Sequence, residues 1–200
     1  PELLKTEKNP NPTASMVPNG YLLMFGPEHA EEQYKALENH KACEAGTKNI
    51  KGSDLDKFFP YINKEGIETA TFTDNKSEGW IDPFLFHTAL KSKAIEQGAE
   101  FVKGEVKSLS EINAKIIVSA AGCWTKELLE DIPVEPQKHT VFRVKCPKHI
   151  PEMPLTGDLT TGVYWRPEGK EYLAGSPKSV FDADDLEPAW DDFEELVWPA

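Results

Sequence analysis

The residues Ile116 to Trp124 read I-I-V-S-A-A-G-C-W and carry the strongest structural signal in the chain. The apolar run Ile116 to Val118 is typical of a strand that is buried on both faces of a parallel sheet. The run ends in Ser119 to Gly122, where no side chain is larger than a methyl or hydroxymethyl group. Small residues between a strand and a helix let a phosphate or a ribose approach backbone N–H groups. A tight turn that needs Gly122 only for its backbone conformation explains the pattern equally well.

The composition indicates a globular and acidic protein. Of the 200 residues, 39% are hydrophobic and 10% are aromatic, which is enough for an ordinary core. The 34 acidic residues exceed the 22 basic ones, and the net charge of −12 opposes nucleic-acid binding. No apolar run approaches the roughly 18 residues of a membrane helix, so we expect no membrane span. The three widely spaced cysteines predict neither a disulfide framework nor a zinc site, and we expect no bound metal.

The residues before this stretch predict a helix and then a strand. Asp82 is a good N-cap, and Pro83 occupies the first helical position, where its missing N–H has no cost. Gly98 closes the helix, and Glu100 to Val106 follows as a strand. The apolar stripe that we expect this helix to bury consists of Phe86, Ala89, Leu90 and Ala94. Together with a short helix from Trp124 to Leu129, this order is typical of α/β layering.

The two ends of the chain predict a different order of helices and strands. The N-terminal part predicts a strand at Tyr21 to Phe25, a helix from Pro27 to Gly46 and a strand at Thr69 to Thr73. From Val134 onward strands follow one another without helices, which favours an antiparallel or mixed sheet. These strands are expected at Lys138 to Lys145, Gly162 to Arg166 and Glu171 to Ala174, and a helix is expected to begin within Trp190 to Trp198.

The predicted fold class is therefore mixed α/β. It combines part of a helix-covered α/β sheet with a second sheet that is mixed or antiparallel. We expect three parts: residues 1–81 and 133–200 contribute to the second sheet, and residues 82–132 belong to the nucleotide-binding part. The sheet of residues 133–200 is expected to lead into the start of a helix.

Six short motifs in a fixed order carry a family resemblance. They are N-G-Y-L at 19–22, E-G-W-I-D-P at 78–83, G-A-E-F-V with G-E-V at 98–106, A-A-G-C-W at 120–124, P-V-E-P at 133–136 and G-V-Y-W-R-P-E-G at 162–169. The chain resembles the D-amino-acid oxidase/sarcosine oxidase class of FAD-dependent oxidoreductases over nearly its whole length. The resemblance implies FAD as the cofactor and hydride transfer from the C–N unit of an amine or amino acid. It also implies that the first of the two sheets is part of a sheet of the FAD/NAD(P)-binding type, with residues 82–132 as the middle part of the FAD-binding domain.

The resemblance also implies roles for individual residues. The flavin's ADP half would lie against Val106 and against the run Ala120, Ala121, Gly122, Cys123 and Trp124. Tyr164 and Arg166 would belong to the substrate domain, where an arginine can hold a carboxylate through two parallel hydrogen bonds. The residues alone also permit Arg166 to pair with a surface acid and Tyr164 to be a packed aromatic. No catalytic residue is predicted.

The chain also departs from the family pattern. The family begins with a G-x-G-x-x-G turn that seats the pyrophosphate, and these 200 residues contain no such pattern. The links from Val106 to Ile116 and from Glu130 to Val134 are shorter than is usual in the family. We therefore expect the chain to correspond to the middle part of the family's fold.

An alternative function follows from the same resemblance. Mitochondrial proteins that resemble this chain are associated with the assembly of respiratory complex I, so an assembly role on the same fold, with complex I as partner, is the second hypothesis. The expected location is the matrix side of the mitochondrion in a eukaryote and the cytoplasm otherwise.

Overall fold

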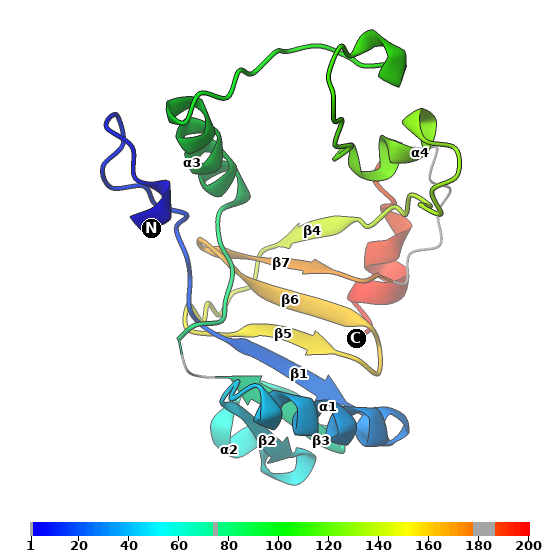
Figure 1. The fold of residues 1–200 in the computed structure, drawn as a ribbon. Coiled ribbons are helices and arrows are strands. Elements are labelled where there is room, and N and C mark those ends of the chain that lie inside the picture. The colour runs from blue at the N-terminus through cyan, green and yellow to red at the C-terminus, as the bar shows by residue number, and fades with distance from the viewer. Residues whose placement is uncertain (1, 74–75, 178–186) are drawn as a thin grey trace.

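The computed structural model describes residues 2–73, 76–177 and 187–200. Its centre is a seven-stranded mixed sheet with the strand order β2-β3-β1-β5-β6-β7-β4 (Figure 1). The strands are β1 (Tyr21–Phe25), β2 (Thr47–Lys51), β3 (Thr69–Thr73), β4 (Val141–Val144), β5 (Leu155–Asp158), β6 (Val163–Glu168) and β7 (Glu171–Gly175). Within the described residues only β1 and β5 pair in parallel. That pair joins the N-terminal and C-terminal parts of the chain into one sheet.

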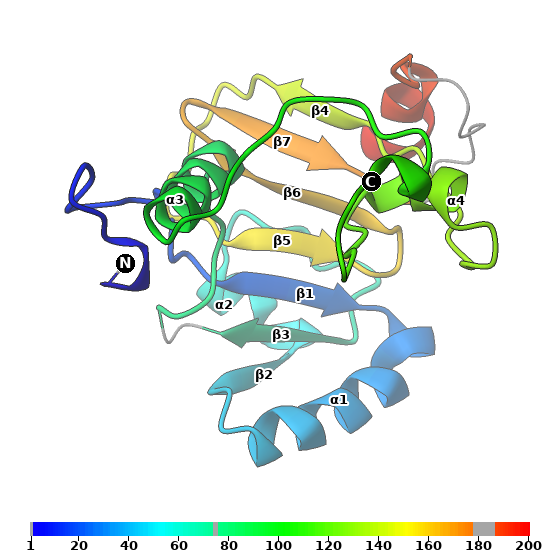
Figure 2. The same cartoon turned by 45° about the horizontal axis from the view of Figure 1, so that its top comes forward.

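The helices are α1 (Ala30–Ala42), α2 (Leu55–Phe58), α3 (Pro83–Glu96) and α4 (Thr125–Leu128), with a π-helical turn at Phe193–Val197. Two helices, α1 and α3, are longer than one turn or so, and the other helices are short. In Figures 1 and 2, α1 and α2 lie at the β2–β3 end of the sheet, and α3 stands away from them, on the side of the left-hand ends of β5, β6 and β7. Helix α1 is fixed to β2 by the buried Gln33, whose side-chain amide donates to Oδ1 of Asn49 at 3.0 Å.

One face of the sheet forms the core. Side chains alternate between the two faces of a strand, so paired residues of neighbouring strands share a face. On this core face Leu22 and Met24 of β1 pack with Ala70 of β3 and with Leu55 of α2. A second cluster on β4, β6 and β7 consists of Phe142, Val163 and Ala174, with Val197 from the C-terminal turn. Trp165 packs against both clusters and connects them.

The opposite face is only partly covered. The register places the alternate residues of β1, β5, β6 and β7 on this side. We call this the open face, and its half-buried side chains include Tyr21, Leu23, Leu155, Tyr164, Arg166 and Leu173. A half-buried sheet face rich in tyrosine and leucine is suited to contact a ligand or another part of a protein.

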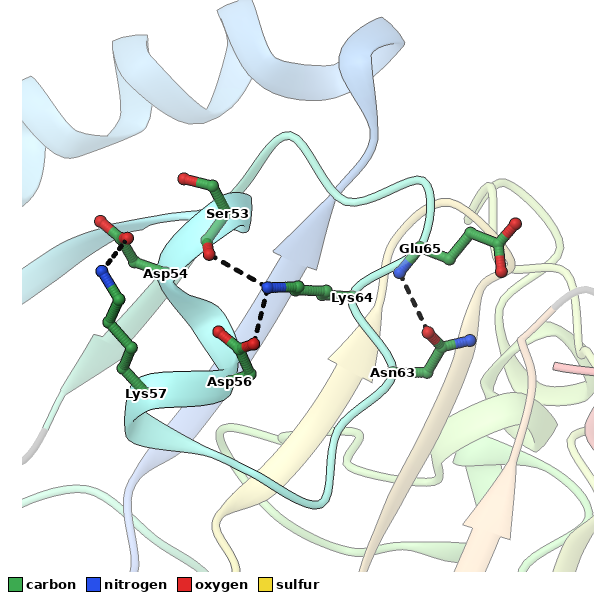
Figure 3. A network of polar contacts seen from close by, with 7 residues as sticks. All are labelled: Ser53, Asp54, Asp56, Lys57, Asn63, Lys64 and Glu65. Carbon is green, nitrogen blue, oxygen red and sulfur yellow. Dashed lines mark hydrogen bonds and ion pairs between the residues drawn. The ribbon is translucent and has the colours of Figure 1, made fainter.

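A polar network holds the connection from α2 to β3 (Figure 3). Lys64 Nζ contacts Asp56 Oδ2 at 2.7 Å and donates to the carbonyl of Ser53 at 3.2 Å, while Lys57 Nζ contacts Asp54 Oδ1 at 2.6 Å. The hydrogen bonds from these lysines lower the pKa of both carboxyl groups. Because the pairs are at the surface, water and salt screen them, and the network fixes the path of the loop more than it stabilises the fold.

Two predicted strands are wrong in this structure. Residues 100–106 and 116–121 are irregular, and Figure 2 shows them in an arch of chain between α3 and α4. Val102, Ile116 and Val118 are 83%, 82% and 84% exposed. A buried parallel strand requires a neighbouring strand, and no described strand pairs with either segment. The mixed α/β fold class itself is confirmed.

Helix α3 begins as predicted but packs differently. Asp82 accepts the N–H of Leu85 at 2.9 Å, and Pro83 follows it as the first helical residue. Of the predicted apolar stripe only Ala89 is buried, whereas Phe86 and Leu90 are exposed. The cap is local and forms without partners, whereas the stripe needs a sheet that residues 100–121 do not form. No described helix is long and apolar enough to cross a membrane.

Candidate functional site

Two of the segments that the sequence singled out meet at one pocket. Its volume is about 590 Å³, and it lies between residues 105–107 and the turn that leads into α4. The lining residues are Glu105, Val106, Lys107, Ala121, Trp124, Glu127 and Leu128. Three of the six predicted FAD-binding residues, Val106, Ala121 and Trp124, thus share one cavity. Ala120, Gly122 and Cys123 adjoin it in sequence but are not among its lining residues.

The backbone at Gly122 explains one part of the sequence pattern. Gly122 has φ +60° and begins a single turn of 3-10 helix, Gly122–Trp124, that leads into α4. Residues with a Cβ rarely adopt this left-handed conformation. A Cβ at this position would meet no atom within 4 Å, so the glycine is required by its conformation while the space beside it is open. Within the described chain, both readings of Gly122 therefore remain compatible with the structure.

Ser119, two residues before Ala121 in the chain, is the one polar residue in the run of small residues. Its hydroxyl oxygen is buried and has no hydrogen-bond partner among the described residues. A buried hydroxyl without a partner has a cost of about 1–3 kcal/mol, which a hydrogen bond to a bound group would offset. The signal in the sequence was the single hydroxyl in an otherwise apolar and small run.

Tyr164 lies on the open face between two glycines. It pairs with Gly157 of β5 on one side and with Gly175 of β7 on the other. A Cβ on Gly175 would approach Oη of Tyr164 to 2.8 Å, so the ring leans over the β7 backbone. Burial raises the pKa of Tyr164 above its usual value, although the charge of Arg166 opposes the shift. The phenol is therefore a neutral hydrogen-bond donor at ordinary pH.

Arg166 is two residues further along β6 and shares the open face with Tyr164. Its Nη1 contacts the carboxylate of Glu168 and donates to the carbonyl of Pro167 at 3.1 Å. The side chain is only 19% exposed. Pairing with a neighbouring acid, one of the two roles left open by the sequence, is thus present. For Nε and Nη2 the structure gives no partner among the described residues.

Trp80 is the contact of Arg166 that the sequence did not predict. The guanidinium carbon lies 5.1 Å from the centre of the Trp80 ring, within the range of a cation–π contact. The two residues are far apart in sequence, and no local pattern links them. The motif E-G-W-I-D-P contains Trp80, but in the sequence this motif predicts only the start of a helix and no contact with Arg166.

A second pocket, of about 460 Å³, lies on the core face. It is lined mainly by apolar and aromatic side chains, among them Tyr61, Trp165, Tyr172, Phe193 and Trp198. Burial, followed by the nearby Tyr172 and Glu152, raises the pKa of Tyr61 to about 12. The described residues contain no group of three or more His, Cys, Asp or Glu side chains that could hold a metal ion. The strand β6 separates this pocket from Tyr164 and Arg166, which point to the other face.

Comparison with known families gives one match over almost the entire chain. The model of the family described as DAO, FAD dependent oxidoreductase, matches residues 2–198. FAD-dependent oxidoreductase domain-containing protein 1 of Bos taurus is 29% identical, with 91% of this chain and 48% of the relative covered. The protein of the same name from Xenopus laevis is 28% identical, with 91% and 47% covered. The chain spans about half the length of the curated relatives it matches.

The alignment with these relatives extends over 236 residues, whereas the chain has 200. The relatives therefore contain segments within the matched region that this chain lacks. This agrees with the expectation that some connections in the chain are short.

Solved structures show the same fold. L-proline dehydrogenase from P. horikoshii superposes with a TM-score of 0.70 at 19% identity, covering 91% of this chain and 55% of that one. Glycine oxidase from Geobacillus kaustophilus gives a TM-score of 0.61 at 15% identity, with 92% and 55% covered. At these identities the likeness establishes the fold and no more.

Proposed function

The chain belongs to the FAD dependent oxidoreductase family, and on this premise we propose that the polypeptide containing it oxidises the C–N bond of an amine or amino acid. FAD is the cofactor of the family, and when bound it accepts the hydride that leaves the carbon next to nitrogen. The residues of this chain would bind and orient the substrate and form one wall of the cofactor site. Two of the solved neighbours are described as an L-proline dehydrogenase and a glycine oxidase, and both descriptions agree with this reaction class.

The observation that carries the proposal is the pairing of Tyr164 and Arg166 on the open face. An arginine side chain carries five N–H donors, and here only Nη1 is engaged by described residues. The edge formed by Nε and Nη2 matches the two oxygens of a carboxylate. Beside it, the neutral phenol of Tyr164 can donate one hydrogen bond. These two groups suit a substrate that carries a carboxylate near its reacting C–N bond.

For the cofactor we propose the six residues that the family resemblance implies. They are Val106, Ala120, Ala121, Gly122, Cys123 and Trp124, with residues 82–132 as part of the FAD-binding domain. The pocket shared by Val106, Ala121 and Trp124 supports this, because it brings together the two segments that the family resemblance assigns to the cofactor. Residues 1–81 and 133–200, which share one sheet, would form the substrate domain.

The experiment uses the complete natural polypeptide that contains this chain. Its visible absorption spectrum should show bound flavin, and anaerobic addition of proline, glycine or N-methylglycine should bleach that absorbance for at least one compound. Arg166→Gln should raise the KM for the active compound at least tenfold. A polypeptide that binds no flavin, even when FAD is added, would exclude the oxidoreductase function.

A second candidate is an assembly role for respiratory complex I on the same fold, since a fold does not fix a function. The exposed apolar side chains of Val102, Ile116 and Val118 favour a protein partner, because such groups seldom remain in water. The corresponding location would be the matrix side of the mitochondrion in a eukaryote and the cytoplasm otherwise. Co-purification of complex I subunits with the tagged polypeptide would support this role. A free and catalytically active monomer would count against it.

A further inference from the structure

We propose that Trp80 is a positioning residue, which holds the guanidinium of Arg166 so that its Nε and Nη2 edge faces the carboxylate of the substrate. The inference rests on the proposed function, in which Arg166 binds that carboxylate. It adds a specific requirement, namely that an aromatic ring must lie against the guanidinium for the carboxylate to bind well.

The backbone of Trp80 is fixed on both sides. Its carbonyl accepts the N–H of Val17 at 2.9 Å, and its own N–H donates to the Val17 carbonyl at 3.3 Å. The preceding residue is Gly79, and a Cβ there would lie 2.0 Å from the Val17 oxygen. Two positions later, the carbonyl of Ala14 accepts the N–H of Asp82 at 2.8 Å. The ring therefore projects from a backbone that is bonded to the N-terminal segment and has little freedom to move.

The contacts of Arg166 leave one edge of the guanidinium for a ligand. The Trp80 ring approaches the guanidinium carbon at 5.1 Å, and Glu168 with the carbonyl of Pro167 holds Nη1. These contacts restrict the rotation of a side chain that would otherwise lose rotamer freedom on binding a ligand. Since the side chain is 19% exposed, its charge is screened less than that of a surface arginine. The described residues use neither Nε nor Nη2, so the pre-oriented edge is available to a planar anion.

This arrangement distinguishes a carboxylate from a neutral group of the same shape. Nε and Nη2 present their N–H groups in the plane of the fork and match two carboxylate oxygens at once. An amide offers only one acceptor oxygen, and its NH2 group would face a second donor. The ring of Trp80 strengthens the site only through the orientation and charge of Arg166, so its removal should affect carboxylates and leave amides unchanged.

The test measures binding of propionate and propionamide to the complete natural polypeptide by calorimetry, which does not depend on the flavin signal. Trp80→Leu should weaken propionate binding about three- to tenfold, as expected for a partly desolvated cation–π contact. Trp80→Phe should restore most of the loss, and neither change should alter propionamide binding. Trp190→Leu is the matched control, because Trp190 is 70% exposed and lies on the other side of the sheet.

Two variants, Arg166→Gln and Trp80→Leu, separate failure of the inference from failure of the proposed function. If Arg166→Gln abolishes the preference for propionate but Trp80→Leu leaves it intact, the carboxylate site stands and the role of Trp80 is overturned. If Arg166→Gln changes nothing, or if the natural polypeptide binds no propionate, the carboxylate site itself is wrong. If Trp80→Leu does not fold, the same test uses Tyr, Phe and His at position 80. We expect the affinity for propionate to fall in the order Trp, Tyr, Phe, His. Equal affinities across that series would contradict the inference.

Discussion

The ring of Tyr164 lies over the backbone of Gly175 on the neighbouring strand. A Cβ on Gly175 would stand 2.8 Å from Oη and 3.0 Å from Cζ of that ring. Tyr164 and Gly175 are paired in the β6–β7 ladder, so the tyrosine occupies the space that a side chain on β7 would fill. The orientation of the phenol on the open face thus depends on the absence of a side chain at residue 175.

We therefore expect Gly175→Ala to displace the tyrosine and to lower the free energy of unfolding by about 1–3 kcal/mol, the usual cost of overpacking. Thermal or urea denaturation measures the change. Gly104→Ala is the matched control, because a Cβ there meets no atom within 4 Å, and it should be nearly neutral. Truncating the ring with Tyr164→Ala should recover part of the loss in the double variant. Additive effects of the two changes would contradict the contact.

Asp82 caps α3, and its removal should destabilise the protein locally. Asp82 Oδ1 accepts the N–H of Leu85 at 2.9 Å. We expect Asp82→Ala to lower the free energy of unfolding by about 0.5–2 kcal/mol, the usual value for an N-cap, and to increase amide exchange in the first turn of α3. Asp82→Asn keeps an acceptor oxygen in the same place and should retain most of the stability. A loss of equal size in both variants would indicate that the charge matters more than the cap.

The prediction of the Asp82 cap was correct and the prediction of the nearby strands was wrong for the same physical reason. The signal of Asp82 and Pro83 is local, because the cap forms within three residues. The signal of Ile116 to Val118 indicates only that these side chains avoid water, and the structure lacks the neighbouring strand that would bury them. A pattern of hydrophobicity predicts the need for a partner but does not provide one.

Two strands were not predicted at all. β2 reads T-K-N-I-K and contains a single buried apolar residue, Ile50, because it is an edge strand with three exposed positions. β5 reads L-T-G-D, and its glycine and aspartate disfavour a strand by propensity. It forms because Leu155 to Asp158 pairs with β1 and β6, which are contacts that no local pattern contains. For the same reason, the approach of Trp80 to Arg166 could not be foreseen from either motif.

The stability of the protein should fall in alkaline solution through Tyr61. Burial raises the pKa of this phenol from 10.0 to about 12, and Tyr172 and Glu152 add to the shift. A raised folded-state pKa means that the folded state keeps the proton more strongly than the unfolded state. The stabilisation is therefore complete below pH 10 and is lost as the pH rises from 10 to about 12.

For this loss we expect at most about 2 kcal/mol, because partial exposure reduces the effect of a two-unit shift. Urea denaturation at a series of pH values measures it. Tyr61→Phe removes the titrating group and should flatten the slope of stability against pH in this range. Tyr34→Phe is the control, since Tyr34 is exposed on α1, and it should leave the slope unchanged. An unaltered slope in Tyr61→Phe would refute the assignment.

Gly122 allows the two interpretations of A-A-G-C-W to be separated, because its conformation and the space beside it can be changed independently. At φ +60° an asparagine is tolerated far better than valine, yet it adds a side chain where none exists. If Gly122 serves only the turn, Gly122→Asn should keep both stability and FAD affinity, and Gly122→Val should lower stability by about 1–3 kcal/mol. If the flavin's ADP portion approaches the backbone here, as we propose, Gly122→Asn should keep stability but weaken FAD binding at least tenfold. Melting temperature and flavin titration of the complete natural polypeptide measure the two quantities, and an unchanged flavin affinity in Gly122→Asn would leave the glycine with its conformational role alone.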